Sequence, residues 1–208
     1  MKSRAKLAPT KLTGLILAGG RSTRMGRDKA LLSYDGEPQL VRAQRLLASL
    51  CTRVLVSVRS DQIDVLRRSE LRSRFPALEL VIDDPEDAGP VAGLLAAWHQ
   101  APSAALLVLA VDLPLVDESL LRLLLEARDP GALATAFEHP DGTLEPLCTV
   151  WEPAAEPILR ARARNSNVSL RRVLESSTVK RIRPPDPAAI QSVNTPDDDA
   201  ELRGLTEL

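Results

Sequence analysis

One stretch near the start of the chain combines residue types that bind anions. Residues 17–29 read LAGGRSTRMGRDK, in which two adjacent glycines, three arginines and a lysine follow a short apolar run. Adjacent glycines let the backbone approach a ligand closely, because they carry no Cβ and reach positive φ. Their amide hydrogens can then point at phosphate oxygens. Arg24 and Lys29 add positive charge, so the stretch is predicted to hold a phosphate-bearing ligand.

The stretch matches neither of two common phosphate-binding loops. It lacks the G-x-G-x-x-G pattern of dinucleotide-binding folds and the G-x-x-x-x-G-K-[ST] pattern of P-loops. A pair of glycines alone would be explained as a turn with solvated arginines around it. The whole combination is more specific than that.

Carboxylates follow two of the apolar runs. Asp112 ends the run AALLVLAVD, while Asp83 and Asp84 follow LELVI. A carboxylate at the end of a buried strand lies where open α/β sheets bind ligands. Its oxygens suit Mg²⁺, a hard cation that also accepts phosphate oxygens. Taken singly, Asp112 is better explained as a helix cap or loop brace. The alternative for Asp83 and Asp84 is a polar strand exit before a helix start.

The elements that must position these residues alternate along the chain. Some runs are apolar at every position, with no alternating polar residues, and between them lie stretches whose apolar residues recur with the period of a helix. This pattern predicts a parallel sheet covered by helices on both faces. Strands are expected at 12–18, 53–59, 78–82 and 104–112, and helices after Pro38, over 61–74, from Val91 and after Asp117. Beyond residue 130 we expect a less regular lobe, with strands at 132–137 and 145–151 around a turn at 141–142, a helix over 167–174 and a capped terminal helix from 194.

The composition excludes several classes of protein. The 208 residues include 27 basic and 28 acidic side chains, a net charge of −1, so no overall field steers the chain to nucleic acid or to a membrane. Cys51 and Cys148 stand in no metal-binding or disulfide pattern. The longest apolar run, 104–111, is too short to span a bilayer. We therefore expect a cytoplasmic protein with no nucleic-acid or membrane partner.

The length fits a single domain. No Gly/Ser-rich linker divides the chain, so we expect a flexible basic tail over 1–11 and a single domain over 12–208. The apolar start is interpreted as a first buried strand rather than a secretory leader, because it is short and arginines follow it at once.

His99 and His139 are expected near the surface, and the two tryptophans in the core.

Four motifs together resemble the molybdenum cofactor guanylyltransferases, a family of MobA-like NTP transferases. The family pattern of Gly-Gly, three residues, Arg-Met-Gly and then Lys matches residues 19–29, and AVDLP matches the family's metal-binding aspartate. The stretch DDPEDAGPVAG resembles a strand-end aspartate followed by Gly-Pro-Leu-Ala-Gly, with Asp84 as the aspartate and Val91 for leucine. SVNTPDD resembles Asn-x-Asn-Thr-Pro, with Asn194 as the second asparagine.

The resemblance implies a fold, an activity and a site. The fold would be a three-layer, Rossmann-like α/β nucleotidyltransferase fold with a mostly parallel central sheet. The activity would be transfer of GMP from GTP to molybdenum-carrying molybdopterin with release of pyrophosphate, and other partners would be a molybdoenzyme or a cofactor-delivery protein. By the resemblance, Lys29, Arg24 and Asp112 are catalytic, Asp112 binds Mg²⁺ and Asn194 lies at the acceptor. The nucleotide would contact Leu17, Ala18, Gly19, Gly20, Lys29, Ser57, Asp84 and Asp112.

Two departures from the family pattern leave alternatives open. Ser57 stands where the family often has an asparagine near the guanine, and Ser192 replaces the first asparagine of the C-terminal motif. A serine cannot make the paired contacts of an amide. LAGG nevertheless resembles the guanylyl enzymes more than their cytidylyl relatives. Arginines 160, 162, 164, 171 and 172 fit either an acceptor phosphate or a solvated face.

The alternative functions are two. The first is another NTP transferase of this fold, using CTP or a sugar-phosphate or polyol-phosphate acceptor. The second is a non-catalytic protein that binds and delivers the nucleotide or cofactor. Retention of both Lys29 and Asp112 argues against the second, because binding alone needs less charge.

Overall fold

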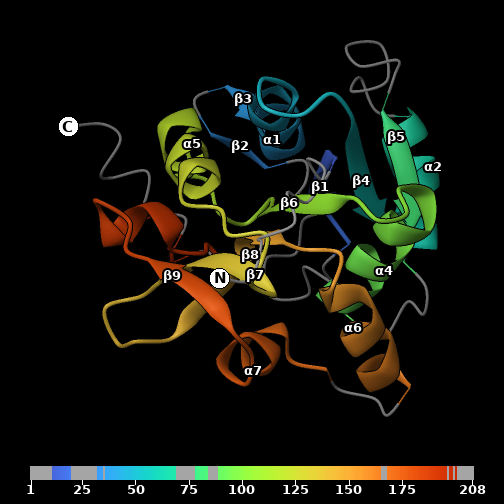
Figure 1. The fold of residues 1–208 in the computed structure, drawn as a ribbon. Helices are drawn as coiled ribbons and strands as arrows, with labels where there is room; N and C mark the ends of the chain where they lie inside the picture. Colours follow the sequence, from blue (N-terminus) through green and yellow to red (C-terminus); the bar gives the residue numbers. More distant parts are fainter. Residues whose placement is uncertain are drawn as a thin grey trace, which may run out of the picture.

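A seven-stranded sheet in the order β5-β4-β1-β6-β8-β7-β9 forms the centre of the computed structural model (Figure 1). The structure describes residues 11–19, 32–34, 36–68, 78–83, 89–164, 168–195, 197–198 and 200. The strands of the sheet are β1 (Leu12–Leu17), β4 (Val54–Val58), β5 (Glu79–Ile82), β6 (Ala105–Ala110), β7 (Ala134–Glu138), β8 (Leu144–Trp151) and β9 (Val179–Ile182). A separate hairpin consists of β2 (Ser33–Tyr34) and β3 (Glu37–Pro38).

The sheet is mostly parallel, as predicted. β1 pairs in parallel with β4 and β6, β4 with β5, and β7 with β9, while β8 is antiparallel to both of its neighbours. The strands beyond residue 130 therefore extend the main sheet. We expected a less regular lobe here; β8 instead pairs directly with β6 along four residue pairs, and the one irregularity is a register shift between β7 and β8.

Helices cover both faces of the sheet and give the three predicted layers (Figure 1). Side chains of α1, α2 and α5 pack on one face, and those of α4, α6 and α7 on the other. Their bounds are α1 Gln39–Ala48, α2 Ile63–Arg68, α4 Pro90–Gln100, α5 Glu118–Glu126, α6 Ala155–Ala163 and α7 Leu170–Glu175, with short 3₁₀ turns at Ser60–Gln62 and Pro187–Ile190. None of the helices in the described ranges is long and apolar enough to cross a bilayer.

β6 is the central strand of the core. All six of its residues are buried, and they alternate between the two packed faces: 105, 107 and 109 join α1 and α5, whereas 106, 108 and 110 join α4, α6 and α7. A strand covered on both faces needs apolar residues at every position. This explains why its sequence shows no polar alternation.

Residues at the starts of α5 and α4 form the helix cap and the turn that the sequence predicted. Asp117 caps α5 by accepting the Leu120 amide hydrogen at 2.8 Å, and Gly89, with φ of 60°, precedes Pro90 at the start of α4. Trp98 of α4 is buried, and its indole nitrogen donates to the Ala104 carbonyl at 2.9 Å. These contacts connect α4 to the start of β6.

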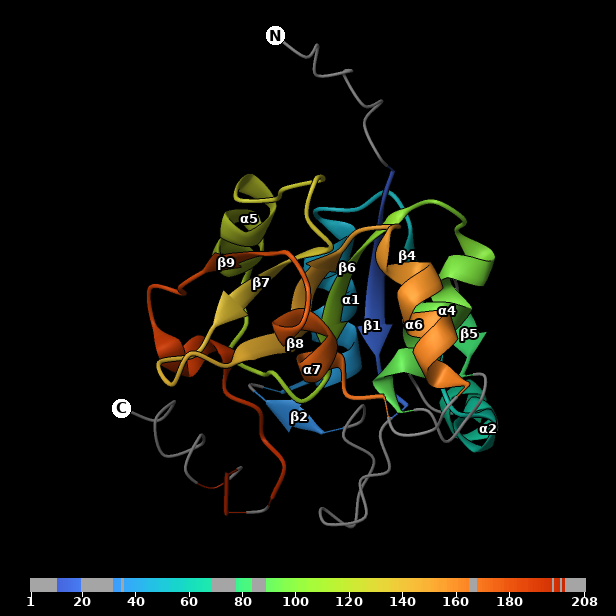
Figure 2. The same cartoon turned by 60° about the horizontal axis from the view of Figure 1, so that its bottom comes forward.

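The carboxyl ends of β1, β4, β5 and β6 meet at one edge of the sheet, because these strands are parallel. Figure 2 shows the direction of the β1 arrow, and Val193 is hydrogen-bonded at the same end of the sheet, to Asp112 after β6. The start of β8 lies at the same edge, since β8 is antiparallel to β6.

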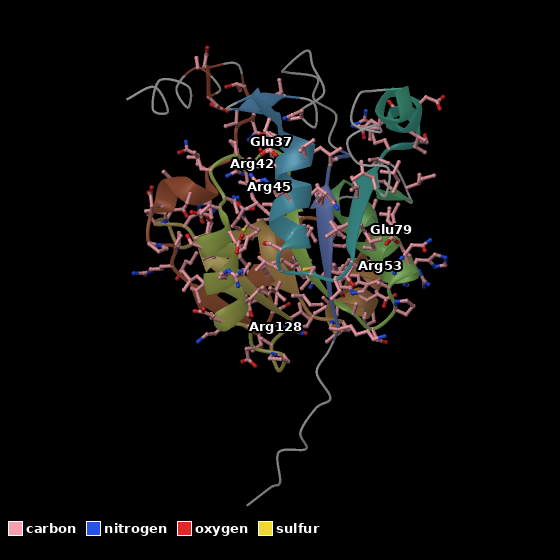
Figure 3. The ribbon with its side chains drawn as sticks, turned by 90° about the horizontal axis from the view of Figure 1, so that it is seen from above. Glu37, Arg42, Arg45, Arg53, Glu79 and Arg128 are labelled. Atoms are coloured by element: carbon pink, nitrogen blue, oxygen red, sulfur yellow. The ribbon has the colours of Figure 1, made fainter. Side chains whose placement is uncertain are left out.

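A buried ion pair lies at the opposite end of the sheet. Arg128, after α5, contacts Glu152, after β8, in a bidentate pair with Nε–Oε1 and Nη2–Oε2 distances of 2.6 and 2.9 Å. The Glu152 side chain is only 2% exposed. Figure 3 shows Arg128 far from Glu37 of the β2–β3 hairpin, which forms a surface pair with Arg45.

Arg128→Ala is predicted to destabilise the protein strongly. Removal of the guanidinium leaves the buried Glu152 carboxylate without its partner, which costs about 3–5 kcal/mol in comparable sites. The free energy of unfolding, measured by urea denaturation, should fall by that amount. Arg122→Ala, which breaks the exposed i,i+4 pair with Glu118, is the matched control and should leave the denaturation midpoint nearly unchanged. Equal losses in the two variants would contradict this interpretation.

Candidate functional site

The pairing of β1 with β6 brings the glycine turn and the central aspartate together. Leu17 pairs with Ala110, and the Val111 amide donates to the Leu17 carbonyl at 3.2 Å. Ala18 and Gly19 therefore leave the sheet beside the segment that carries Asp112. Of the predicted site residues, the structure brings Leu17, Ala18, Gly19, Ser57, Asp112 and Asn194 to this edge, whereas Gly20, Arg24, Lys29 and Asp84 lie outside the described residues.

Hydrogen bonds with β4, and with the residues that follow β4, fix the backbone of the turn after β1. The Ala18 amide donates to the Ser57 carbonyl at 3.0 Å. The Ala18 carbonyl accepts from Gln62 Nε2 at 3.0 Å, and the Gly19 carbonyl from Arg59 Nη1 at 2.7 Å. Two carbonyls are thus bound by side chains from beyond β4, which holds this peptide segment in one orientation.

Sequence reasoning missed Arg59 and Gln62. Arg59 lies 40 positions from Gly19 and Gln62 lies 44 positions from Ala18, the residues whose carbonyls they bind. Neither belongs to a recognisable motif, so only the β1–β4 pairing reveals their role. Asp61 holds the Arg59 guanidinium in turn, with an Nε–Oδ1 distance of 2.9 Å.

A close approach at Gly19 explains the requirement for glycine there. A Cβ at this position would overlap Oδ2 of Asp83, which is buried at 6% exposure. The other oxygen of Asp83 accepts a hydrogen bond from the Ser57 hydroxyl. Asp83 therefore links the carboxyl ends of β1, β4 and β5. Of the pair Asp83–Asp84, sequence reasoning selected only Asp84, whose role stays a prediction.

A second close approach occurs at Gly93 in the first turn of α4. A Cβ there would lie 2.7 Å from Leu17 Cδ2 and 2.9 Å from Ser57 Cβ. The helix therefore rests directly on the ends of β1 and β4. This packing explains the glycine at the end of the Gly-Pro-Val-Ala-Gly stretch.

The C-terminal segment is bound to the end of β6. The Val193 amide donates to the Asp112 carbonyl at 2.8 Å, so the neighbouring Asn194 lies near Asp112 in the fold. Asn194 Nδ2 donates to the hydroxyl of Ser192 at 2.7 Å. The serine that replaces the first asparagine of the motif is thus the hydrogen-bond partner of the second.

The predicted cap of the terminal helix is present. The Asp198 amide donates to Thr195 Oγ1 at 3.1 Å. Asp198 Oδ2 in turn accepts the amides of Thr195 and Asn194 at 2.9 and 2.8 Å. This reciprocal arrangement is a capping box, and it fixes the backbone at Asn194.

A further carboxylate at this edge was not anticipated. Glu145, at the start of β8, is 6% exposed and accepts the Leu147 amide at 2.7 Å. Its second oxygen lies 3.1 Å from Nε2 of His139. Burial raises the pKa of the Glu145 carboxyl above its usual range, the two hydrogen bonds oppose the rise, and the charge of Asp112 adds to it. His139, expected only as a turn residue, thus has a carboxylate partner.

The donor groups at this edge suit a hard divalent ion only in company with a ligand. No group of three or more His, Cys, Asp or Glu side chains among the described residues converges on a metal site. Mg²⁺ is usually held by one or two carboxylates together with substrate phosphates and water. The half-buried Asp112 fits that kind of site. The five arginines from 160 to 172 are all exposed, and Arg160 pairs with Glu156.

The chain is similar to proteins of molybdenum cofactor biosynthesis. The MobA-like NTP transferase domain matches residues 14–182. The chain is 32% identical over 200 residues to the molybdenum cofactor guanylyltransferase of Pseudomonas fluorescens, covering 95% of each. It is 30% identical over 203 residues to the molybdenum cofactor biosynthesis bifunctional protein of Synechocystis sp., covering 96% of this chain. The chain spans 56% of the length of that bifunctional relative.

Solved structures share the fold. Molybdopterin-guanine dinucleotide biosynthesis protein A from Archaeoglobus fulgidus superposes with a TM-score of 0.74 at 22% identity, covering 94% of this chain and 98% of that one. A Mycobacterium tuberculosis protein solved in complex with manganese superposes with a TM-score of 0.69 at 20% identity, covering 93% and 98%. At these identities the likeness establishes the three-layer fold.

Gly93→Ala is predicted to destabilise the site edge. The new methyl group would press on Leu17 and Ser57, and overpacking of this kind costs about 1–3 kcal/mol. The melting temperature should fall accordingly, as measured by differential scanning calorimetry. Gly131→Ala is the matched control, because the nearest atom to its Cβ is the flexible end of Asp129 at 3.2 Å. A Gly93→Ala protein as stable as this control would refute the close-packing argument.

Proposed function

The chain belongs to the MobA-like NTP transferase family, and from this premise we propose that it transfers GMP from GTP to molybdenum-carrying molybdopterin with release of pyrophosphate. The observation that carries the proposal is the convergence of three features at one sheet edge. These are the turn after β1, Asp112 after β6 and the segment with Asn194. A nucleotidyltransferase must hold a triphosphate, a cation and an acceptor in one place.

The proposed reaction requires that the two substrates be positioned correctly, and it requires no side-chain nucleophile. A phosphate oxygen of the acceptor attacks the α-phosphorus of GTP, a new P–O bond forms, and the bond from the α-phosphorus to the bridging oxygen breaks. Pyrophosphate leaves with that electron pair. The acceptor phosphate is already anionic at neutral pH, so no Ser-His or Cys-His pair is needed. The rate then depends on orientation and on neutralising negative charge.

The nucleotide side of the site is assigned to the β1 turn. The amides of Gly19 and Gly20, with Arg24 and Lys29, would bind the triphosphate, whereas the Ala18 amide is already used on the Ser57 carbonyl. The hydrogen bonds to the Ala18 and Gly19 carbonyls support this assignment, because they hold the start of the loop rigid before the ligand arrives. Leu17, Ser57 and Asp84 would line the remainder of the nucleotide site.

A divalent ion, proposed to be Mg²⁺, would be held by Asp112 with phosphate oxygens of the nucleotide. When bound, such an ion offsets charge on the phosphates. The manganese complex of the M. tuberculosis neighbour supports a divalent ion in this fold. The choice of magnesium is part of the proposal.

The acceptor would approach from the C-terminal segment. Asn194, fixed beside the end of β6, is placed to meet it, with Ser192 as its partner. The near-balanced net charge of −1 supports small-molecule partners rather than nucleic acid. The receiving molybdoenzyme or delivery protein and a cytoplasmic location stay predictions.

The test is pyrophosphate release from GTP, CTP, ATP and UTP, with and without molybdopterin. Release that needs both GTP and molybdopterin supports the proposal. Preference for CTP, or for a sugar-phosphate or polyol-phosphate acceptor, would identify a different transferase of the same fold. Tight GTP binding without Mg²⁺-dependent release would indicate a non-catalytic delivery protein.

Lys29→Ala and Asp112→Asn are predicted to lower the rate of pyrophosphate release by about 10²–10³-fold, the effect of losing one preorganised charge. The loss in Asp112→Asn should also appear as a higher Mg²⁺ requirement. Lys180→Ala, at an exposed position on β9, is the control and should release pyrophosphate at the wild-type rate. Normal rates in both site variants would rule out the assignment.

A further inference from the structure

The start of α1 lies at the edge of the sheet where β1 ends. β1 and β4 are parallel neighbours, and α1 lies in the connection between them. A connection between parallel strands must return the chain along the sheet, so α1 runs against β1 and begins at the edge where β1 ends. Figure 3 agrees, since Glu37, next to the start of α1, lies at the far end of the molecule from Arg128. The start of α1 and the turn after β1 therefore share one edge.

The positive end of this helix is not offset by a nearby acid. The first turn of a helix leaves backbone amides without intrahelical partners. The Gln39 amide donates to the Leu32 carbonyl at 2.8 Å, but no side chain of the described residues caps α1, and its first turn holds no acidic residue. Glu37, which precedes the helix, is held by Arg45 with an Nη2–Oε2 distance of 3.0 Å. The start of α1 therefore favours an anion from outside.

A buried amide donor is directed at the same place. Gln39 is the first residue of α1 and is only 3% exposed. Its Nε2 is buried and has no hydrogen-bond partner among the described residues. Side chains on a helix lean towards the N-terminus of that helix, so Gln39 Nε2 lies at the start of α1. A buried donor without an acceptor is unfavourable and calls for a partner that arrives with a ligand.

We propose that the start of α1, together with Gln39 Nε2, is an oxyanion site that takes a phosphate group of a substrate. The inference rests on the proposed function, because that function brings phosphate groups to this edge. Helix N-termini bind phosphates through their amides and their dipole, and Gln39 adds a side-chain donor to them. Two sources carry such a group, the pyrophosphate end of the nucleotide and the terminal phosphate of the acceptor.

The experiment measures binding of inorganic pyrophosphate and of inorganic phosphate to the full-length chain by isothermal titration calorimetry. Gln39→Met keeps the length of the side chain and removes its donor. The dissociation constant should rise about ten-fold or more, the usual effect of losing one hydrogen bond to a charged group. The inference is overturned if the wild type binds neither probe, or if the affinity of Gln39→Met is within about two-fold of the wild type.

Gln44→Met is the matched control. Gln44 lies in the middle of the same helix, and its Oε1 is also buried without a partner among the residues that the structure describes. Because it lies away from the helix start, its variant should bind both probes like the wild type. An equal loss of affinity in the two variants contradicts the inference, since it would reflect a general change in α1.

Gln39→Glu covers the case in which Gln39→Met fails to fold. It keeps the shape of the side chain, and a carboxylate is favourable at a helix start. That carboxylate would take the place of the bound anion and repel it, so pyrophosphate should bind more weakly than to Gln39→Met. A purely structural residue predicts the reverse order, with the variant of unchanged shape nearest to the wild type. Wild-type affinity in Gln39→Glu refutes the inference.

Pyrophosphate release separates the two sources and the two proposals. In Gln39→Met, a Michaelis constant raised for GTP alone identifies the nucleotide as the source, and one raised for molybdopterin alone identifies the acceptor. If the variant loses probe binding but the wild type releases no pyrophosphate from any nucleotide, the oxyanion site stands and the proposed transfer is wrong. Wild-type release with unchanged constants for both substrates in Gln39→Met leaves the transfer standing and the inference wrong.

Discussion

The parallel pairing of β1 with β6 is the constraint on which the site depends. Neighbouring strands lie about 4.8 Å apart, and the ladder runs to their last residues, with Leu17 beside Ala110. The chain leaving β1 and the chain leaving β6 therefore emerge side by side. A backbone-lined turn and a carboxylate are the two parts needed to hold a phosphate and its cation. Their separation is set by the sheet and not by the loops.

Two close approaches then determine what surrounds that pair of strand ends. Gly19 lets the β1 turn lie against Asp83, and Gly93 lets α4 lie against Leu17 and Ser57. In each case a missing side chain allows backbone to come where a methyl group would not fit. Ser57 is used in this packing and in a hydrogen bond to Asp83. A serine at this position thus serves the junction of β1, β4, β5 and α4, where a larger amide would need more room.

The elements that could be predicted from the sequence are those whose signals lie in residues close together along the chain. β6 was predicted because a doubly covered strand is apolar throughout, and the caps of α5 and the terminal helix because their residues are local. α6 and β9 were not predicted, since α6 buries only Ala155 and Leu159 and the middle residues of β9 are exposed. The place of β7 and β8 in the main sheet depends on pairing between distant segments. Arg59 and Gln62 act across such pairings, so no local pattern marks them.

Two buried glutamates show how differently one residue type can be used in a single fold. Glu152, at one end of the sheet, meets a bidentate arginine, and its charge is balanced within the protein. Glu145, at the other end, meets an imidazole, an amide and the charge of a second acid. The first arrangement is complete without a ligand. The second is built from an amide and an imidazole of the same hairpin, and it lies at the end of the sheet where the turn after β1 emerges. The same acidic side chain is thus paired with a guanidinium at one end of the sheet and hydrogen-bonded by groups that can be neutral at the other.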